Sequence, residues 1–396
     1  MNSTNNPDVV IIGAGASGLM CAATAGYRGR NVWVLEHTHK IGRKILMSGG
    51  GRCNFTNLHN GPDNFISGNA HFCKSALSRY RVQDFIELVE RHGVEYHEKT
   101  LGQLFCNEKS TEILRVLLTE AEWAGVSIKT EVKVESITAK SEGGFTLKTT
   151  LGEIHPETVV IATGGLSIPN GGATPFAYEV AKQFGLTVTP TTAALVPVTL
   201  QKELLDKLNP LSGVSHPVVA SCNGTSFKES MLFTHRGLSG PAILQISSYW
   251  TPGDAITIDF FPEESLLDYL KAQREERPKA DIVTVLSSKM SKRMAQIFAE
   301  LYAISGNMAD QSNAKLEQVA NTFHAWSVKP SGTEGYRTAE VTLGGIDTNG
   351  ISQKTMEAKT QQGLYFIGEC LDVTGHLGGH NFQWAWASGF AAGQVV

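Results

Sequence analysis

Asp8-Val-Val-Ile-Ile12 followed by Gly13-Ala-Gly-Ala-Ser-Gly18 is the stretch of sequence that decides the fold. It consists of an apolar run, a glycine turn and a small-residue segment with helical character that extends to about Tyr27. A second apolar run, Asn31-Val-Trp-Val-Leu35, comes next. This order predicts a βαβ unit of about 30 residues. Continuous apolar strands are typical of a parallel sheet that is buried on both faces.

The turn has the spacing G-x-G-x-x-G, and a physical reason favours glycine at each of the three positions. Gly13 permits the tight turn, Gly15 lets backbone N–H groups approach a pyrophosphate, and Gly18 allows the helix to pack closely on the strand. The positive end of the helix dipole faces the same place. Glu36, at the end of the second strand, would accept hydrogen bonds from the hydroxyls of an adenosine ribose. Together these features predict a dinucleotide site.

Two later segments favour FAD over NAD. Val159–Gly165 is a buried strand that ends in a glycine turn, and Gly363–Asp372 is another strand, ended by an acid that could bind the ribityl hydroxyls of FAD. Gly378–Phe382 then opens an apolar helix, whose N-terminus could stabilise negative charge on the N1–C2=O edge of a reduced flavin. The alternative interpretation of 366–379 is a glycine-rich loop between a strand and a helix.

A basic, glycine-rich segment lies between these motifs. Lys40, Arg43, Lys44 and Arg52 place four cations and no acid within residues 40–52. Such a loop can neutralise a pyrophosphate and lie against a flat ring. The alternative is a solvated basic surface.

Composition limits the classes of partner. The 396 residues carry 34 Lys and Arg against 38 Asp and Glu, which is a formal net charge of −4. Nucleic-acid-binding proteins usually have a basic surplus, so we expect no nucleic-acid partner. Six cysteines without a C-x-x-C pair indicate reduced thiols. The apolar run at Val9–Gly26 is interrupted by glycines and no other run approaches membrane-spanning length, so we expect a cytoplasmic protein without membrane contact.

The rest of the chain suggests an inserted region. Residues 71–128 are expected to be mostly helical and 128–162 to return to strands. From about residue 191, short β-like runs separated by turns predict an antiparallel sheet or small barrel. Residues 263–325 have helical spacing, and the final stretch from 339 returns to a glycine-rich strand, turn and helix.

Several longer motifs resemble the YhiN-like (BaiN-type) flavoproteins: Gly13–Gly18, Gly42-Arg-Lys-Ile-Leu-Met-Ser-Gly-Gly-Gly-Arg-Cys-Asn-Phe-Thr-Asn57, Phe233-Thr-His-Arg-Gly-Leu-Ser-Gly-Pro-Ala242, Ala339-Glu-Val-Thr-Leu-Gly-Gly345, Gly368-Glu-x-x-Asp372 and Gly378-Gly-x-Asn-Phe-Gln-Trp-Ala-Trp386. The resemblance covers nearly the whole chain. It implies bound FAD in an α/β, glutathione-reductase-like Rossmann domain with a parallel sheet. It also implies an inserted β-barrel-like domain that carries a small helical insert. Branches of the family are assigned as reductases of unsaturated steroid-like acids or as amine oxidases.

The expected domains and site follow from these motifs. The FAD domain comprises residues 1–190 and 339–396, the β-barrel-like domain 191–262 and 326–338, and the helical insert 263–325. The expected FAD-binding residues are Gly13, Gly15, Ala16, Ser17, Gly18, Glu36, Gly42, Arg43, Lys44, Gly50, Gly51, Arg52, Cys53, Asn54, Val132, Thr163, Gly164, Gly165, Gly368, Glu369, Asp372, Gly378, Gly379, Asn381 and Phe382.

The chemistry is expected to reside in the flavin. Ser48 and Cys53 have the spacing of the redox-active pair of disulfide-type flavin reductases, but only one of them is a thiol, which argues against a dithiol relay. No second G-x-G-x-x-G follows a strand, so NAD(P)H would dock only transiently. We expect hydride transfer through flavin N5 from NAD(P)H to a small unsaturated organic substrate. The alternatives are an amine-type oxidase that uses dioxygen, a flavin-dependent RNA-modifying enzyme and a non-enzymatic FAD-binding module.

Three histidines are candidates for acid–base or anchoring roles, because imidazole titrates near neutral pH. His235 lies on a predicted turn of the β domain, and His376 and His380 flank the glycine turn after Asp372. Each could equally be a hydrogen-bonded structural histidine. In the resembling family, position 380 is more usually Tyr and position 376 commonly aromatic. No metal-ligand spacing is present, so no metal is expected.

Overall fold

The computed structural model describes residues 6–396 and divides the chain into two compact units. The first unit consists of Met1–Thr192 and Val341–Val396, and the second of Ala193–Glu340. The boundaries expected from the sequence lie after residues 190 and 338. Both ends of the chain therefore belong to one unit, and the second unit is an insertion in its sequence.

A five-stranded parallel sheet runs through the first unit, in the order β21-β11-β1-β2-β7. Val10 in β1 lies opposite Trp33 in β2 and Val159 in β11. The C-terminal strand β21 pairs with β11, so the last part of the chain completes the sheet that the first part begins. The strands are β1 (Val9–Ile12), β2 (Val32–Leu35), β7 (Ser127–Lys129), β11 (Thr158–Ile161) and β21 (Leu364–Phe366).

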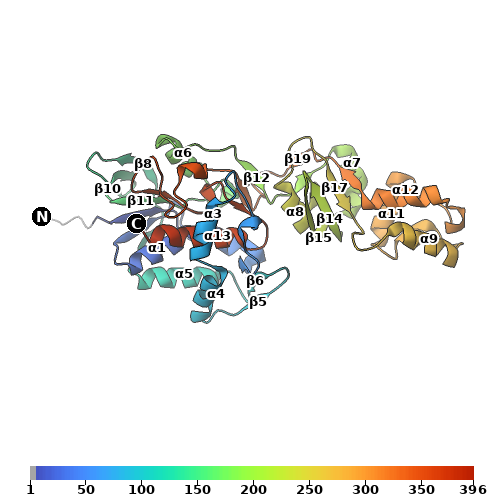
Figure 1. Ribbon diagram of the computed structural model, residues 1–396, viewed down its shortest axis with the longest axis horizontal. Coiled ribbons are helices and arrows are strands. Elements are labelled where there is room, and N and C mark those ends of the chain that lie inside the picture. Colours follow the sequence, from blue (N-terminus) through green and yellow to red (C-terminus); the bar gives the residue numbers. More distant parts are fainter. Residues whose placement is uncertain (1–5) are drawn as a thin grey trace. The chain divides into compact units, whose positions relative to one another are not determined.

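Two helices from opposite ends of the chain, α1 (Ala16–Tyr27) and α13 (His380–Gly393), pack against each other (Figure 1). The approach is close enough to require glycine. A Cβ atom on Gly389 would lie 2.5 Å from the carbonyl oxygen of Ser17, and one on Gly393 would lie 2.5 Å from Thr24 Cβ. The small residues of both helices therefore allow the N-terminal and C-terminal segments to share one hydrophobic core.

Three smaller sheets and five further α-helices also belong to the first unit. The small sheets are β8-β9-β10, β3-β6-β5 and β22-β4. The bounds are α2 (Arg43–Met47), β3 (Asn54–Asn57), β4 (Phe65–Ile66), α3 (Phe72–Arg79), α4 (Val82–Arg91), β5 (Tyr96–Glu98), β6 (Gln103–Cys106), α5 (Thr111–Trp123), β8 (Val134–Ala139), β9 (Phe145–Thr149), β10 (Gly152–Ile154), α6 (Phe176–Gln183), β20 (Val341–Leu343) and β22 (Thr374–Gly375).

Residues 71–128 are less helical than expected. Strands β5 and β6 separate α4 from α5, and β6 pairs with β3, which lies far earlier in the chain. A strand whose partner is remote in sequence is stabilised by that pairing and by burial. Its local sequence therefore need not show the alternation of apolar and polar residues that would indicate a strand.

The second unit contains a seven-stranded antiparallel sheet and a group of helices that share one core. The helices α9 to α12 lie between β17 and β18 in the chain, and Phe298 of α11 contacts Trp326 of β18 with ring centroids 5.3 Å apart. The sheet order is β18-β17-β14-β15-β16-β13-β19. The bounds are β12 (Thr192–Ala194, at the unit boundary), β13 (Val198–Thr199), α7 (Lys202–Leu208), β14 (Ser215–Cys222), β15 (Thr225–Phe233), β16 (Gly237–Ser239), α8 (Pro241–Ser247), β17 (Ile256–Asp259), α9 (Leu266–Glu276), α10 (Ile282–Leu286), α11 (Lys292–Tyr302), α12 (Asn313–His324), β18 (Trp326–Val328) and β19 (Gly332–Thr333).

Three general features of residues 6–396 concern membrane helices, metal ligands and cysteines. None of the helices there is both long enough and apolar enough to cross a bilayer. In the same residues no group of three or more His, Cys, Asp and Glu side chains is placed to hold a metal ion. All six cysteines are free and buried.

Candidate functional site

The turn between β1 and α1 leaves an open space at the helix N-terminus. A Cβ on Gly13 would lie 2.5 Å from Ala162 O, and one on Gly18 would lie 2.0 Å from Gly13 O, so these two glycines are required by the protein's own packing. Gly15 differs, because a Cβ there would meet nothing within 4 Å. No side chain caps this helix end and its first turn has no acid. Its free N–H groups therefore suit an anionic ligand.

Glu36 follows β2 and is held against the same turn. Its carboxylate accepts hydrogen bonds from Ala14 N at 3.1 Å and from Thr38 N at 2.8 Å. Burial alone would raise the pKa of Glu36, but hydrogen bonds from His37, Thr38 and Ala14 outweigh it and hold the pKa below its usual value. Val132 N donates to the carbonyl of Glu36 at 2.9 Å. Glu36 is thus an ionised acceptor, and Val132 lies directly beside it.

The carboxyl end of β11 meets this turn and presents an unused polar atom. Thr163 Oγ1 is buried and has no hydrogen-bond partner within residues 6–396. Buried hydroxyls are nearly always hydrogen-bonded, so this atom suits a polar ligand. Gly164 has a φ of +72°, and a Cβ on Gly165 would lie 2.5 Å from Thr342 Oγ1. The glycine pair at the end of β11 therefore packs against the start of the C-terminal segment.

The C-terminal segment touches the first turn of α1. Gly368 has a φ of +72°, and a Cβ there would lie 2.6 Å from Ser17 Oγ. Four residues later, the nearly buried Asp372 accepts a hydrogen bond from Gly68 N at 2.9 Å. Burial raises the pKa of Asp372 above its usual value. A hydrogen bond donated by a further hydroxyl, such as one on a ribityl chain, would favour the ionised form of Asp372 and lower its pKa.

The basic segment contributes fewer free cations than its sequence suggests. Lys44 Nζ donates to Ser167 Oγ at 2.6 Å and forms an ion pair with Glu369 at 2.5 Å. Arg43 donates to the carbonyl of Asn170 at 3.1 Å. Lys40 and Arg52 are exposed, and their side chains form no hydrogen bond or ion pair within residues 6–396. Lys44 and Glu369 thus bind each other, and their expected contact with FAD stays a prediction.

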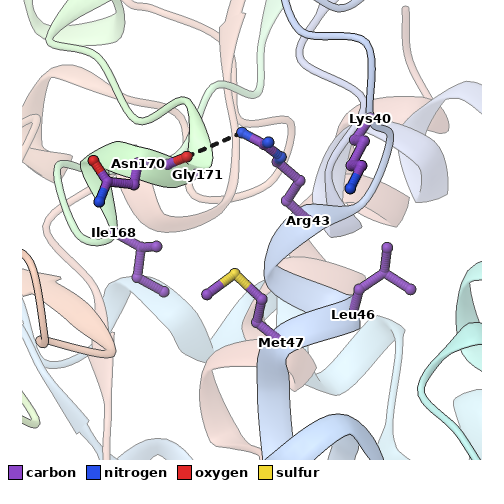
Figure 2. A pocket seen from close by; sticks show the side chains of 7 residues that line it. All are labelled: Lys40, Arg43, Leu46, Met47, Ile168, Asn170 and Gly171. Atoms are coloured by element: carbon purple, nitrogen blue, oxygen red, sulfur yellow. Dashed lines mark hydrogen bonds between the residues drawn. The ribbon is translucent and has the colours of Figure 1, made fainter.

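A pocket of about 240 Å³ lies between α2 and the turn at 168–171. Figure 2 shows Arg43 reaching across to Asn170, with Met47 and Ile168 below this contact and Lys40 on the other side of Arg43. Ile168 has a φ of +59°, which is rare for a β-branched residue. The pocket therefore combines apolar side chains with two cations.

The glycines at 49–51 form a short 3-10 turn, Ser48–Gly51, in which Gly49, Gly50 and Gly51 have positive φ values. A Cβ on Gly50 or Gly51 would meet nothing within 4 Å, so open space also lies above this loop. Cys53 is buried, and burial raises the pKa of its thiol to about 12. Cys53 is therefore a neutral thiol.

The start of α13 follows a glycine turn and is held by polar contacts. Gly379, which directly precedes α13, has a left-handed backbone with a φ of +97°. Gly42, which directly precedes α2, has the same kind of backbone with a φ of +65°. Asn381 donates to and accepts from the backbone of Gly375, both at 2.8 Å, so its amide holds the turn. Phe382 is half-buried and stacks on Trp386 at 5.5 Å.

His376 and His380 lie together at this helix start. Their ring centroids are 6.5 Å apart, and His380 Nδ1 is 2.8 Å from Asn60 Oδ1. Burial, together with the nearby His376 and His59, lowers the pKa of His380 to about 3, and burial also lowers the pKa of His376. His380 is therefore neutral at physiological pH. His235 lies in the second unit on the exposed turn after β15, and its role stays a prediction.

The buried His380 should make folding stability depend on pH. Imidazole titrates near 6.5 in an unfolded chain, whereas the folded pKa is about 3. The unfolded state then binds more protons, so stability is fully present above pH 6.5 and declines as the pH falls towards 3. We expect His380→Asn to reduce the slope of unfolding free energy against pH by about 1.4 kcal/mol per pH unit between pH 6 and 4.

Urea unfolding at several pH values measures this slope. The matched control is His71→Asn, because His71 is an exposed histidine of the same unit. The control should keep the wild-type slope. Equal slopes for all three proteins would contradict the expectation.

Several polar residues of the site carry no signal in a single sequence. Gly68 supplies the N–H that Asp372 accepts, and Ser167 and Thr342 bind Glu369. Asn57 and Asn60 contact the start of α13. Asn57 and Thr342 lie inside the longer motifs quoted above, but nothing in those motifs indicates their partners.

Comparisons with known proteins agree on a family. The model of the HI0933-like protein Rossmann domain matches residues 7–395. The chain is 52% identical to a ribosomal RNA dihydrouridine synthase of Escherichia coli K12, over 98% of this chain and 97% of that one. It is 28% identical to a 3-dehydro-bile acid delta(4,6)-reductase of Clostridium scindens, over 98% of each chain.

Solved structures are similar in fold. The 3-ketosteroid-delta4-(5alpha)-dehydrogenase of Rhodococcus jostii RHA1 matches with a TM-score of 0.50 and 15% identity, over 99% of this chain and 98% of that one. The FrdA subunit of E. coli quinol fumarate reductase also gives 0.50, with 16% identity over 98% of this chain and 69% of its own. The family match extends over both units of the chain and includes every residue of the site described above. The chain therefore belongs to the HI0933-like family of Rossmann-fold flavoproteins.

Proposed function

We propose that this protein is an FAD-dependent reductase that converts uridine in ribosomal RNA to 5,6-dihydrouridine. The observation that carries the proposal is the 52% identity, over nearly the full length of both chains, to a protein named for that reaction. A Haemophilus influenzae protein of the same name is 47% identical over 96% of each chain. This proposal adopts the RNA-modifying alternative. It replaces the small unsaturated organic substrate that was expected, and also the absence of a nucleic-acid partner that was expected from the balanced charge.

The residues of the first unit suit FAD. The N–H groups at Gly15–Gly18 would bind the pyrophosphate, Glu36 the adenosine ribose, and Asp372 the ribityl hydroxyls. The unpartnered Thr163 hydroxyl and the open space beside Gly15 and Gly50 are the features that a bound ligand would satisfy. When bound, FAD supplies two-electron hydride chemistry at N5.

Reduction of uridine adds two electrons and two protons across C5 and C6. We propose NAD(P)H as the source of the hydride, which carries both electrons and one proton, and solvent as the source of the second proton. His380, with a pKa of about 3, is neutral and so acts as a hydrogen-bonding group and not as an imidazolium acid. His376, whose pKa is also lowered by burial, has the same limited role.

A second candidate is reduction of an unsaturated small molecule. The 28% identity to the bile acid reductase favours it, because that relative also spans 98% of this chain. Both names denote addition of hydrogen to a carbon–carbon double bond. The two candidates therefore differ in the substrate and not in the type of reaction.

Anaerobic turnover with two substrates distinguishes these functions. The purified yellow protein is mixed with NADH or NADPH and then with unmodified ribosomal RNA transcribed in vitro, and the RNA nucleosides are analysed by mass spectrometry. We expect the flavin band to bleach and a dihydrouridine peak to appear. Turnover of a conjugated steroid-like acid without any dihydrouridine would support the second candidate. Flavin reduction by an amine alone, with reoxidation by dioxygen, would reject both.

Lys40 should contribute to RNA affinity through phosphate. Its ammonium group is exposed and unpaired within residues 6–396, beside Arg43 at the pocket of Figure 2. We expect Lys40→Ala to weaken RNA binding several-fold and to reduce the slope of log K against log salt by about 0.7–0.9. Fluorescence anisotropy with an rRNA fragment at several salt concentrations measures both.

Lys148→Ala is the matched control, because Lys148 is an exposed lysine on β9 of the same unit. All three proteins should contain the same amount of FAD. An unchanged salt slope in Lys40→Ala would contradict this role of Lys40, and a loss of FAD would assign it to the cofactor instead.

A further inference from the structure

Strand β3 is joined to the beginning of α13, more than 300 residues later in the chain. A Cβ on Gly379 would lie 2.5 Å from Thr56 O, so the glycine turn rests directly on the strand. Trp386 Nε1, further along the helix, donates to Phe55 O at 2.8 Å. The position of the helix is thus defined by the strand along two of its turns.

Asn57 and Asn54 make the contacts nearest the helix N-terminus. Asn57 is almost fully buried, and its Nδ2 donates to Gly378 O at 2.9 Å and to Leu101 O at 3.1 Å. The amide of Asn54 lies against the same turn, and in the orientation that satisfies both of its ends the oxygen accepts from Gly379 N at 3.2 Å. The two amides therefore bind both residues of the turn that starts the helix.

Thr56 makes a different contact on the same strand. Its hydroxyl donates to Gln383 Oε1 at 2.7 Å, one turn into the helix, and Gln383 Nε2 donates to Tyr80 O at 3.0 Å. These side chains are fully buried. The hydroxyl of Thr56 thus fastens the body of the helix, whereas the contact of this residue with the glycine turn is made by its backbone carbonyl.

We propose that Asn57, assisted by Asn54, is a positioning residue that fixes the Gly378–Gly379 turn and thereby sets the reduction potential of the bound flavin. The inference rests on the proposed FAD chemistry. Negative charge that develops on a reduced flavin at N1–C2=O would be stabilised by the N–H groups of this helix start.

Asn57 and Asn54 can affect the reduction potential because a helix N-terminus stabilises negative charge only over a short range. The favourable effect of a helix N-terminus is confined to its first turn, so the direction of those few N–H groups decides its size. Gly378 and Gly379 have φ values of +115° and +97°. Glycine visits such conformations freely but is not confined to them. The two asparagine amides supply the restraint that the glycines lack.

The test measures the flavin reduction potential of Asn57→Ala as purified holoprotein, by equilibration with a reference dye. We expect the ratio of reduced to oxidised flavin at a fixed dye potential to fall about tenfold, equivalent to about 30 mV for a two-electron couple. Asn57→Ser can retain one donor and should show a smaller shift in the same direction. If Asn57→Ala does not retain FAD, the Ser variant carries the measurement.

Thr56→Val is the matched control, because it removes a buried hydrogen bond between the same strand and the same helix. It should lower stability and leave the potential unchanged. A wild-type potential in both Asn57 variants, or an equal shift in Thr56→Val, would overturn the proposal. If the wild-type protein does not bind FAD, the proposed function is rejected. If the wild-type protein reduces uridine in RNA but the Asn57 variants keep the wild-type reduction potential, only the role of Asn57 is rejected.

Discussion

Gly15→Ala is expected to give a folded protein that binds FAD about ten to a hundred times more weakly. The backbone at Gly15 has a φ of −91°, which alanine adopts freely, and the new methyl group would meet no protein atom within 4 Å. It would instead occupy the space in front of the α1 N–H groups. Overfilling a close contact costs about 1–3 kcal/mol, and each 1.4 kcal/mol is a factor of ten in affinity.

Fluorescence titration of the apoprotein with FAD measures the loss, and thermal unfolding of the apoprotein shows whether the fold is intact. Gly61→Ala is the control, since its Cβ would also lie in open space, with Asn64 Oδ1 3.9 Å away. Gly18→Ala should differ from both by destabilising the apoprotein, because its Cβ would lie 2.0 Å from Gly13 O. Unchanged FAD affinity in a folded Gly15→Ala would reject the assignment of this turn to the pyrophosphate.

Glu369→Ala is expected to lower the apparent free energy of unfolding by about 3 kcal/mol. Its carboxylate, 18% exposed, accepts from Lys44 Nζ, from Ser167 Oγ at 3.1 Å and from Thr342 N at 3.0 Å. It therefore connects α2, the loop after β11 and strand β20. Truncation removes all three contacts and leaves the Lys44 ammonium without its counter-ion.

Urea unfolding of the apoprotein tests this expectation. Glu369→Gln keeps the size of the side chain and a carbonyl acceptor, so it should cost less than the alanine variant. Glu135→Ala removes an exposed glutamate on β8 and should change stability by less than about 0.5 kcal/mol. A cost for Glu369→Ala no greater than that of Glu135→Ala would show that the three contacts contribute nothing.

The parallel sheet and its glycine turn could be predicted because their signals are local. Val9–Ile12 is apolar at every position and is followed at once by the glycines, and β2 with Glu36 comes within the next 25 residues. The same holds for the apolar runs of β11 and β21. The helical insert was also predictable, since leucines and aromatic residues recur there at helical spacing.

The contacts that complete the site could not be predicted, because they join residues remote in sequence. The approach of Gly368 to Ser17, the bond from Gly68 to Asp372 and the pairing of Lys44 with Glu369 depend on where the chain ends meet. In a sequence, a charged residue is equally compatible with binding a ligand and with pairing to another residue of the protein. Only the coordinates show that Lys44 has a protein partner and that Lys40 has none within residues 6–396.

The late arrival of β21 has a consequence for biosynthesis. Val159 N in β11 donates to Gly363 O, so during translation this edge of the sheet waits for about 200 residues before its neighbour is made. At about 5–20 residues per second that interval is roughly 10–40 s. An unpaired strand edge invites association with other chains. The nascent protein should therefore depend on shielding at β11 until β21 has been made and can pair with it.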